Sequence, residues 1–364
     1  AQVIARWKQD LTEKDQFVRK TFAESYLRNV NLVAATCSIC GSKSFGEVYN
    51  QLFGKHDMQF DVVIMDEASK ATPLEMAIPM VLGKKIILIG DHKQLPPMVD
   101  DDEVKEAFRK IGRSDLVDKL ENIKESQFKR LFEASQKMRQ SLVSTLDTQY
   151  RMHKQIMNCI THFYKDDIEG GLKCGIESSM DSEDWNNRGS RYHGLENPPF
   201  INPDVHAIWV DVDGKEEMNG HSPYNRAELK AIEKILKTLR ASEGYKEYTS
   251  HFSRPEDEEI GIITFYGAQV KELQKMYKEG KLGPGKYKID VVDSFQGMER
   301  NIVIISTVRT DKIGFAKAIE RINVAFSRAK RLLIVVGDKD FFAKNSDYRT
   351  SIQQMEVIGI NQLS

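Results

Sequence analysis

The sequence predicts an α/β protein with mainly parallel sheets, organised as two domains. Short β-branched or aliphatic runs alternate with stretches of helical periodicity along the chain. Several of these runs are apolar at consecutive positions, which is typical of strands that helices cover on both faces. With 364 residues, the chain is also long enough for two domains of ordinary size.

Seven runs have the length and composition of strands: residues 31–35, 62–65, 86–89, 207–210, 260–264, 302–307 and 332–336. A charged stretch with apolar residues at helical intervals is expected to form a helical connector over residues 100–144. Residues 166–203 are polar and rich in Gly, Ser, Asn and Asp, and are expected to form a long surface excursion that adds little to either core. These patterns predict a first domain at 1–144, a second at 145–346 and a tail at 347–364.

The composition excludes several classes of protein. Apolar residues make up 40% and charged residues 29%, a balance that argues against disorder. The 53 Lys and Arg residues against 54 Asp and Glu residues give a net charge of -1, so a polyanion would have to be held by a local groove.

The chain offers no obvious signal for the membrane or for secretion. No apolar run approaches the ~20 residues that cross a bilayer, and the first 30 residues carry too many charges for a signal peptide. Four cysteines are too few for a disulfide scaffold, and the Cys37-x-x-Cys40 pair lacks a second pair at zinc-site spacing. We therefore expect an intracellular protein, cytoplasmic or nuclear, without a membrane partner.

Two adjacent carboxylates follow the apolar run 62–65. Ligands of open parallel sheets sit beyond the carboxyl ends of the strands, where Asp66 and Glu67 would emerge. Asp66 would bind Mg²⁺, usually through water, and Glu67 would orient or deprotonate an attacking water. The alternative is an ordinary acidic loop after a strand.

A second polar loop, Gly90-Asp91-His92-Lys93-Gln94-Leu95-Pro96-Pro97, follows the run 86–89. Gly90 allows a sharp turn, and the two prolines stop the chain from continuing as strand or helix. Gln94 could then contact a phosphate or a catalytic water. The alternative, favoured when the segment is taken alone, is a simple turn.

Together these segments resemble a known family. In order, the chain contains Asp66-Glu67-Ala68-Ser69, the loop 90–97, Gln149-Tyr150-Arg151-Met152, Val292-Asp293-Ser294-Phe295-Gln296-Gly297-Met298-Glu299 and Arg321-Ile322-Asn323-Val324-Ala325-Phe326-Ser327-Arg328-Ala329-Lys330. This series is similar to the superfamily 1 helicases that move 5′ to 3′, the group of senataxin and the RNA-decay helicases. The resemblance implies two RecA-like domains, ATP and Mg²⁺ as cofactors, and single-stranded or partly duplex DNA or RNA as partner.

The resemblance also implies roles for individual residues. Arg151 and Arg328 would stabilise the charge on the transferred phosphoryl group, an effect worth ~10³ to 10⁵-fold in rate. Nucleotide contacts would come from Tyr150 against adenine, with Gly297 and Glu299, and nucleic-acid contacts from Thr36, Ser294 and Gln296. Simpler alternatives are a salt-bridged surface role for Arg328, interdomain packing for Tyr150 and a helix-start carboxylate for Glu299.

One expected motif does not occur in the sequence. A motor of this kind needs a G-x-x-x-x-G-K-[ST] loop around the phosphates, and residues 37–44 lack two of its glycines. We therefore expect a first RecA-like domain that is incomplete at its N-terminus, an upstream part of the same protein that supplies the phosphate loop, and a fragment that is poorly active alone.

Two other functions compete with the motor. A non-catalytic nucleic-acid-binding scaffold could keep the fold, although it would have no chemical need for all six of the candidate residues Asp66, Glu67, Gln94, Arg151, Glu299 and Arg328. A metal-dependent nuclease could use carboxylates at strand ends, but Glu67-Ala68-Ser69-Lys70 is one residue longer than the E-x-K spacing common in such sites.

Overall fold

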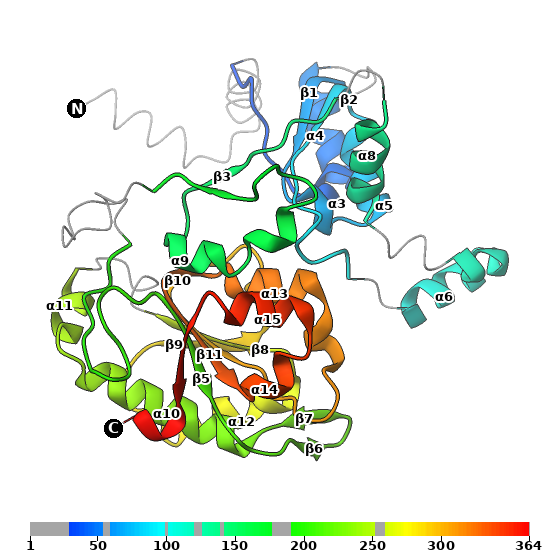
Figure 1. Cartoon of the computed structure of the whole chain (residues 1–364). Coiled ribbons are helices and arrows are strands. Elements are labelled where there is room, and N and C mark those ends of the chain that lie inside the picture. Colours follow the sequence, from blue (N-terminus) through cyan, green and yellow to red (C-terminus); the bar gives the residue numbers. More distant parts are fainter. Residues whose placement is uncertain are drawn as a thin grey trace, which may run out of the picture. The chain divides into compact units, whose positions relative to one another are not determined.

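The fold is described from a computed structural model of the whole chain (Figure 1). The residues that the structure describes are 29–53, 59–98, 101–119, 126–138, 142–176, 191–251 and 259–363. The chain divides into two compact units. Unit 1 consists of Ala1–His92 and Pro96–Ser141, and unit 2 consists of Lys93–Leu95 and Leu142–Ser364.

Unit 1 is built around two short parallel strands. Its elements are α3 (Cys37–Cys40), α4 (Lys43–Phe53), β1 (Phe60–Met65), η1 (Ala68–Lys70), α5 (Pro73–Met80), β2 (Gly83–Leu88), α6 (Asp101–Lys110), η2 (Ser114–Lys119) and α8 (Gln127–Gln136). β1 pairs with β2 in parallel, with Ile64 opposite Ile87. The expected connector at 100–144 thus contains helices α6 and α8 in its described parts, whereas residues 99–100, 120–125 and 139–141 lie outside them.

The two faces of the β1–β2 pair differ. One face packs into a small core in which Met65, Met76 and Phe128 are buried. The apolar side chains of the other face are exposed, among them Ile64 at 61% and Ile87 at 47%. The expectation that helices cover both faces is therefore wrong for this pair within the described chain.

Unit 2 contains a six-stranded parallel sheet with the order β12-β5-β11-β10-β8-β9 (Figure 1). Its strands are β5 (Ala207–Asp211), β8 (Ile260–Thr264), β9 (Tyr287–Val291), β10 (Arg300–Ser306), β11 (Ala329–Gly337) and β12 (Glu356–Gly359). Smaller elements of strand are the parallel pair β3 (Thr148–Gln149) and β4 (Lys173–Cys174) and the hairpin of β6 (Glu217–Asn219) and β7 (Ser222–Tyr224).

Helices flank this sheet. They are α9 (Lys154–Asn158), η3 (Thr161–Tyr164), α10 (Arg226–Ala241), α11 (Tyr245–Ser250), α12 (Gly267–Lys278), η5 (Val292–Phe295), η6 (Gly314–Lys317), α13 (Ile319–Phe326), α14 (Lys339–Phe342), α15 (Ser346–Ile352) and η7 (Ile360–Gln362).

Alternation along the strands separates two cores. In β10, Ile302 and Ile304 lie in the core shared with α10 and α12, while Val303 and Ile305 lie in the core shared with α9, α13 and α15. Successive side chains of a strand point to opposite faces, so a continuous apolar run serves both layers. The predicted α/β class with a mainly parallel sheet is confirmed.

Three expectations differ from the structure. Residues 31–35 are exposed and join no ladder within the described chain, because a strand needs a paired neighbour and not only apolar residues. The expected tail at 347–364 instead contains most of α15 and strand β12, which pairs with β5. The excursion 166–203 contributes the fully buried Leu195 and Phe200 to the core, and its residues 177–190 lie outside the described chain.

No helix in the described parts of the chain combines the length and the apolar character that crossing a membrane requires.

Candidate functional site

The first candidate residues lie at the carboxyl end of β1. Asp66 and Glu67 are both exposed, and the Asp66 Oδ1 accepts a hydrogen bond from the Glu67 amide at 2.9 Å. Glu67 has a left-handed backbone with φ of 53°. A non-glycine residue in this region costs roughly 1–2 kcal/mol, and such residues cluster at functional sites.

Ser69 joins this end of β1 to the loop that follows β2. Its amide lies so close to Gly90 that a Cβ on Gly90 would approach it to 2.9 Å, so only glycine fits there. The Ser69 hydroxyl accepts from the Asp91 amide, and its carbonyl accepts from the Ser126 hydroxyl at 3.0 Å. The two loops thus form one packed edge, as expected from parallel strands.

The tip of the second loop belongs to unit 2. Lys93 forms an ion pair with Asp167 at 3.2 Å, and its carbonyl accepts from the side-chain Nδ2 of Asn323 at 2.8 Å. Leu95 is 4% exposed in the core of unit 2. Gln94, the predicted contact to water or phosphate, is half-buried between these two anchored neighbours.

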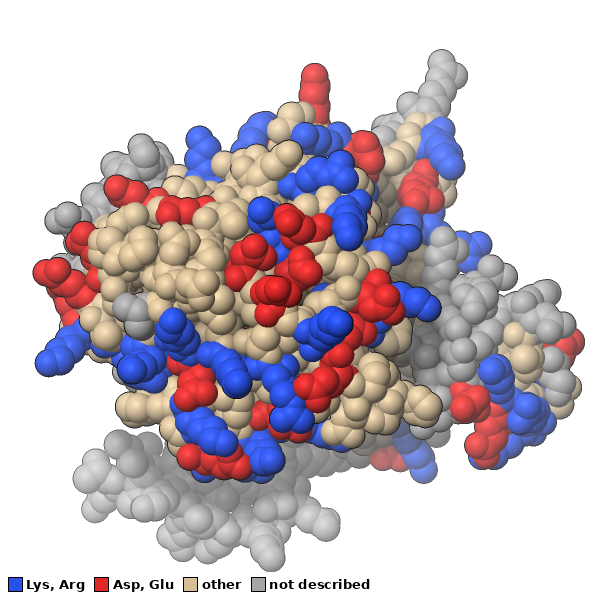
Figure 2. Space-filling model, turned by 60° about the horizontal axis from the view of Figure 1, so that its bottom comes forward, with Lys and Arg blue, Asp and Glu red and all other residues tan. Residues whose placement is uncertain are grey.

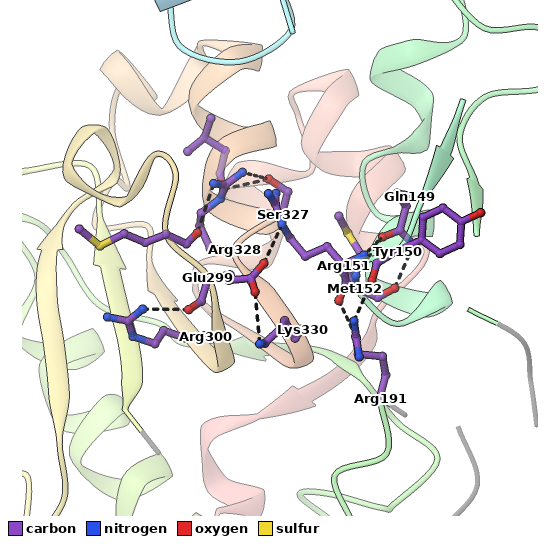
Figure 3. A network of polar contacts seen from close by, with 12 residues as sticks. Gln149, Tyr150, Arg151, Met152, Arg191, Glu299, Arg300, Ser327, Arg328 and Lys330 are labelled. Carbon is purple, nitrogen blue, oxygen red and sulfur yellow. Dashed lines mark hydrogen bonds and ion pairs between the residues drawn. The ribbon is translucent and has the colours of Figure 1, made fainter. Parts of the chain in front are cut away.

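Gln149–Met152 form a tight turn between β3 and α9. The Gln149 Oε1 accepts from the amides of both Arg151 and Met152 at 2.9 Å, and its Nε2 donates to the Met152 carbonyl at 2.9 Å. This side chain replaces the backbone partners that the turn lacks. Tyr150 is 67% exposed, and its ring leaves the turn in the opposite direction from the Arg151 side chain (Figure 3).

Arg151, Glu299 and Lys330 form a charge triad in unit 2 (Figure 3). The Arg151 Nε lies 3.1 Å from one oxygen of Glu299, and the Lys330 Nζ lies 3.2 Å from the other. Partial burial raises the pKa of Glu299, but Lys330 and then Arg151 outweigh that effect, so its pKa lies below the ordinary value. Glu299 is therefore an ionised bridge between two cations at neutral pH.

Arg328, which the resemblance expects to stabilise the transferred phosphoryl group, is buried in unit 2. It is 1% exposed, and its guanidinium donates to the carbonyls of Val324 and Met298 and to the Ser327 hydroxyl, at 3.0, 3.3 and 2.8 Å. Its neighbourhood is shown in Figure 3. In this arrangement Arg328 ties the end of α13 to the segment before β10.

The predicted nucleic-acid residues lie in both units. Thr36 caps α3, accepting from the Ile39 amide at 3.3 Å. Ser294 is exposed and Gln296 half-buried in and after η5, and Gly297 follows with φ of 79°, a conformation that favours glycine. No basic stretch stands out on the face shown in Figure 2, where basic and acidic side chains intermingle over the described residues.

The structure therefore places the predicted residues in two subsets: Asp66 with Glu67 in unit 1, and in unit 2 the Arg151–Glu299 ion pair, with the Tyr150 ring turned away from it. That the two subsets meet around one nucleotide stays a prediction. Ser69 and Lys330 lie in the motifs but were assigned no role by the sequence, and Arg191 was missed altogether. Arg191 is forty positions from the turn it contacts, in a polar stretch that carries no recognisable signal.

The residues fit the implied Mg²⁺. Asp66 uses one carboxylate oxygen for the Glu67 amide and is exposed at the strand end. Mg²⁺ typically binds one or two carboxylates and completes its shell with water and phosphates. A single carboxylate is consistent with this, and the described residues form no all-protein cluster of three or more potential ligands.

Comparison with known proteins gives consistent matches. Residues 123–340 match a family model described as an AAA domain, and residues 1–102 match a second model with the same description. The chain is 29% identical to an uncharacterised ATP-dependent helicase of Methanocaldococcus jannaschii, over 95% of this chain and 44% of the relative.

Two fission-yeast relatives are similar at the same level. The ATP-dependent helicase upf1 of Schizosaccharomyces pombe is 31% identical over 88% of this chain and 30% of its own length. The helicase sen1 of the same organism is 30% identical over 89% of this chain and 17% of its own length. The chain thus spans less than half the length of each of these relatives.

Proposed function

Because the chain belongs to the AAA-domain family and, within it, to the superfamily 1 helicases related to upf1 and sen1, we propose that it is the motor portion of an ATP-dependent helicase. It would couple ATP hydrolysis to movement along DNA or RNA, 5′ to 3′, and to unwinding. The observation that carries the proposal is the turn of unit 2, which presents an exposed Tyr150 and an Arg151 held by Glu299.

In the proposed mechanism, each residue has a defined task. Asp66 would hold Mg²⁺, whose charge offsets the charge of the phosphates, and Glu67, with Gln94, would orient the attacking water. Tyr150 would stack on adenine, with Gly297 and Glu299 beside the nucleotide. Arg151 would leave Glu299 for the transferred phosphoryl group, and Lys330 would remain as the counter-ion of Glu299.

Arg328 needs a different account. Its guanidinium is held by three hydrogen bonds and the residue is 1% exposed, so a direct contact with phosphate would require a rearrangement around it. We assign the main share of charge stabilisation to Arg151. Arg328 would contact phosphate only in a conformation in which its hydrogen bonds to the carbonyls of Val324, in α13, and of Met298 are broken.

The partners follow from the same assignment. Thr36, Ser294 and Gln296 would contact the backbone of the nucleic acid, and binding would weaken as salt rises. Another part of the same protein would supply the phosphate loop that these 364 residues lack. An intracellular location, cytoplasmic or nuclear, is supported by the cysteines, since all four are free thiols.

Nucleic-acid-stimulated ATPase assays test the function. We expect this polypeptide alone to show at most trace turnover. A longer polypeptide of the same protein that includes a phosphate loop should show stimulated turnover, which Arg151→Ala lowers by about 10³-fold or more.

Two results would count against the proposal. Robust turnover by the 364 residues alone would contradict the need for an external phosphate loop. Full turnover by the longer Arg151→Ala protein would contradict the role of Arg151.

A further inference from the structure

The ring of Tyr150 is seated on the backbone at Gly175. A Cβ added to Gly175 would lie 2.2 Å from Cε1 and 2.5 Å from Cζ of this ring, so the close approach requires glycine. Gly175 follows β4, which pairs with β3 in a register that sets Cys174 opposite Gln149, and its amide donates to the Gln149 carbonyl at 2.9 Å. The β3–β4 pair thus fixes the position of Gly175 beneath the ring.

A second group holds the same turn at its carbonyls. The Arg191 Nη2 donates to the Tyr150 carbonyl at 2.7 Å, and its Nε donates to the Arg151 carbonyl (Figure 3). A guanidinium presents several donors in a rigid fork, so one side chain fixes two successive carbonyls. The internal bonds of Gln149 fix the amides of Arg151 and Met152.

The turn is therefore fixed at three places: the carbonyls of Tyr150 and Arg151, the amides of Arg151 and Met152, and one face of the Tyr150 ring. Although Tyr150 lies against Gly175, it is still 67% exposed. A ring that is supported from below and open to solvent can receive a planar ligand without first losing rotamer freedom. Such preorganisation raises the affinity for the ligand, because the side chain is already ordered in the folded protein.

We propose that Gly175 and Arg191 are positioning residues of a preformed stacking platform for the base of a purine nucleotide, complete within unit 2. The inference rests on the proposed function, which assigns adenine to Tyr150. It goes further in stating that the platform is already formed before the nucleotide binds. The affinity for the nucleotide would then depend on Gly175 and Arg191 as well as on Tyr150.

Binding of 1,N6-etheno-ATP to this polypeptide tests the proposal, because fluorescence of the etheno base is quenched when it stacks on an aromatic ring. A ribose-labelled N-methylanthraniloyl-ATP reports total binding in parallel. In Gly175→Ala the new methyl displaces the ring, so we expect quenching to fall to the level of Tyr150→Ala and affinity to drop about tenfold, the range of a base–aromatic stack. Arg191→Lys, which keeps the charge but not the fork, should give an intermediate loss.

Gly46→Ala is the matched control. Gly46 lies in α4, and a Cβ there would meet nothing within 4 Å, so nucleotide binding should not change. Tyr150→Phe keeps the ring and should retain quenching. Thermal unfolding of every variant is followed by circular dichroism, and a merely structural role of Gly175 would lower the melting temperature without a selective loss of etheno quenching.

Each outcome decides between the two ideas. If Tyr150→Ala weakens binding and Gly175→Ala does not, the platform proposal is overturned and the adenine contact stands. If Tyr150→Ala changes nothing, the adenine contact falls and the platform with it. If wild-type protein binds no nucleotide at millimolar concentration, a platform complete within unit 2 is excluded, whereas the helicase function would still be testable in the longer polypeptide.

Discussion

Arg151 and Arg328 have the same expected role in the motifs, but their side chains lie in different environments. The Arg151 side chain is 36% exposed and pairs with Glu299, whereas Arg328 is 1% exposed and bonded to two backbone carbonyls and a hydroxyl. A partly exposed ion pair contributes little to stability, while buried carbonyls that lose their donor cost roughly 1–3 kcal/mol each. The two residues should therefore respond to the same mutation in different ways.

We expect Arg151→Ala to change the free energy of unfolding by less than about 1 kcal/mol, and Arg328→Ala to lower it by ~3 kcal/mol or more. Urea unfolding followed by circular dichroism measures both. Lys344→Ala, at an exposed cation outside the site, serves as the control. Equal losses for the two arginines would contradict the distinction drawn between them.

Glu228, at the start of α10, has no cationic partner among the residues that the structure describes. It is fully buried and accepts from the Ser306 hydroxyl at 2.6 Å and from the Val308 amide at 2.8 Å. Burial raises its pKa to about 7, although these hydrogen bonds lower it in part. Val308 has a φ of 72°, a rare conformation for a β-branched residue, and the carboxylate satisfies its amide there.

The raised pKa of Glu228 gives a pH prediction. The folded state keeps the proton at a pH where the unfolded state has lost it, so this contribution is complete below about pH 4.5 and is lost as pH rises through about 7. A shift of this size corresponds to roughly 3 kcal/mol. Urea unfolding measures the difference in the free energy of unfolding between wild type and Glu228→Gln. This difference should fall by roughly 3 kcal/mol between about pH 4.5 and about pH 7.5. A pH-independent difference would refute the raised pKa.

At the scale of elements, continuous apolar runs were the reliable signal. The expected strand 260–264 coincides with β8, and the runs 302–307 and 332–336 fall within or next to β10 and β11. β9 and β12 were missed because Lys288, Asp290 and Glu356 interrupt their apolar pattern. Residues 31–35 show the opposite error, since their composition suits a strand but pairing depends on a neighbour that local sequence does not reveal.

Two glycines, one in the sheet and one in a helix, should respond to alanine in opposite ways. A Cβ on Gly337, at the end of β11, would lie 1.9 Å from the Thr307 Oγ1, which is itself bonded to the Val336 carbonyl. Gly337→Ala should cost about 1–3 kcal/mol by overpacking. Gly46→Ala, in open space within α4, should stabilise unit 1 by ~0.5–1 kcal/mol. Thermal and urea unfolding of both variants would show whether the signs are opposite.

At the scale of the whole molecule, a cluster of histidines joins distant parts of unit 2. The rings of His153 and His206 stack at 3.5 Å, and His193 meets His206 edge-on at 4.7 Å. Burial lowers the pKa of His153 to about 4 and of the other two to about 3, helped by the mutual repulsion of the imidazoles and by Arg191 and Arg331. The three rings are thus neutral in the folded protein.

Unit 2 should consequently lose stability on acidification. The unfolded state binds protons at these histidines below about pH 6.5 and the folded state does not, so their contribution is present above that pH and lost as pH falls. At about pH 5, unfolding would take up three protons at these histidines and release one at Glu228, and His162, whose pKa is lowered mainly by burial, would add to the uptake.

The pH slope of the unfolding free energy measures this uptake. His153→Asn keeps a good helix cap for α9 and should reduce the uptake by one proton, or about 1.4 kcal/mol per pH unit. An unaltered slope in His153→Asn would exclude a depressed pKa at this site.

The candidate site was predictable only in part. Motif order identified Tyr150, Arg151 and Glu299, and the structure brings the last two into an ion pair. The supports were not predictable, because Gly175 and Arg191 act through backbone contacts that depend on the fold and not on residue type. The burial of Arg328 was missed for the same reason, since the sequence of α13 does not reveal which carbonyls will surround its end.

The bare apolar side of the β1–β2 pair has a practical consequence. Side chains such as Ile64 and Ile87 make the polypeptide prone to reversible self-association, which grows with protein concentration and with sulfate, since sulfate strengthens the burial of apolar surface. Light scattering should therefore show an apparent mass that climbs on concentrating the sample, and Ile64→Lys should flatten that rise. Crystallisation trials and binding titrations would both benefit from the charged variant.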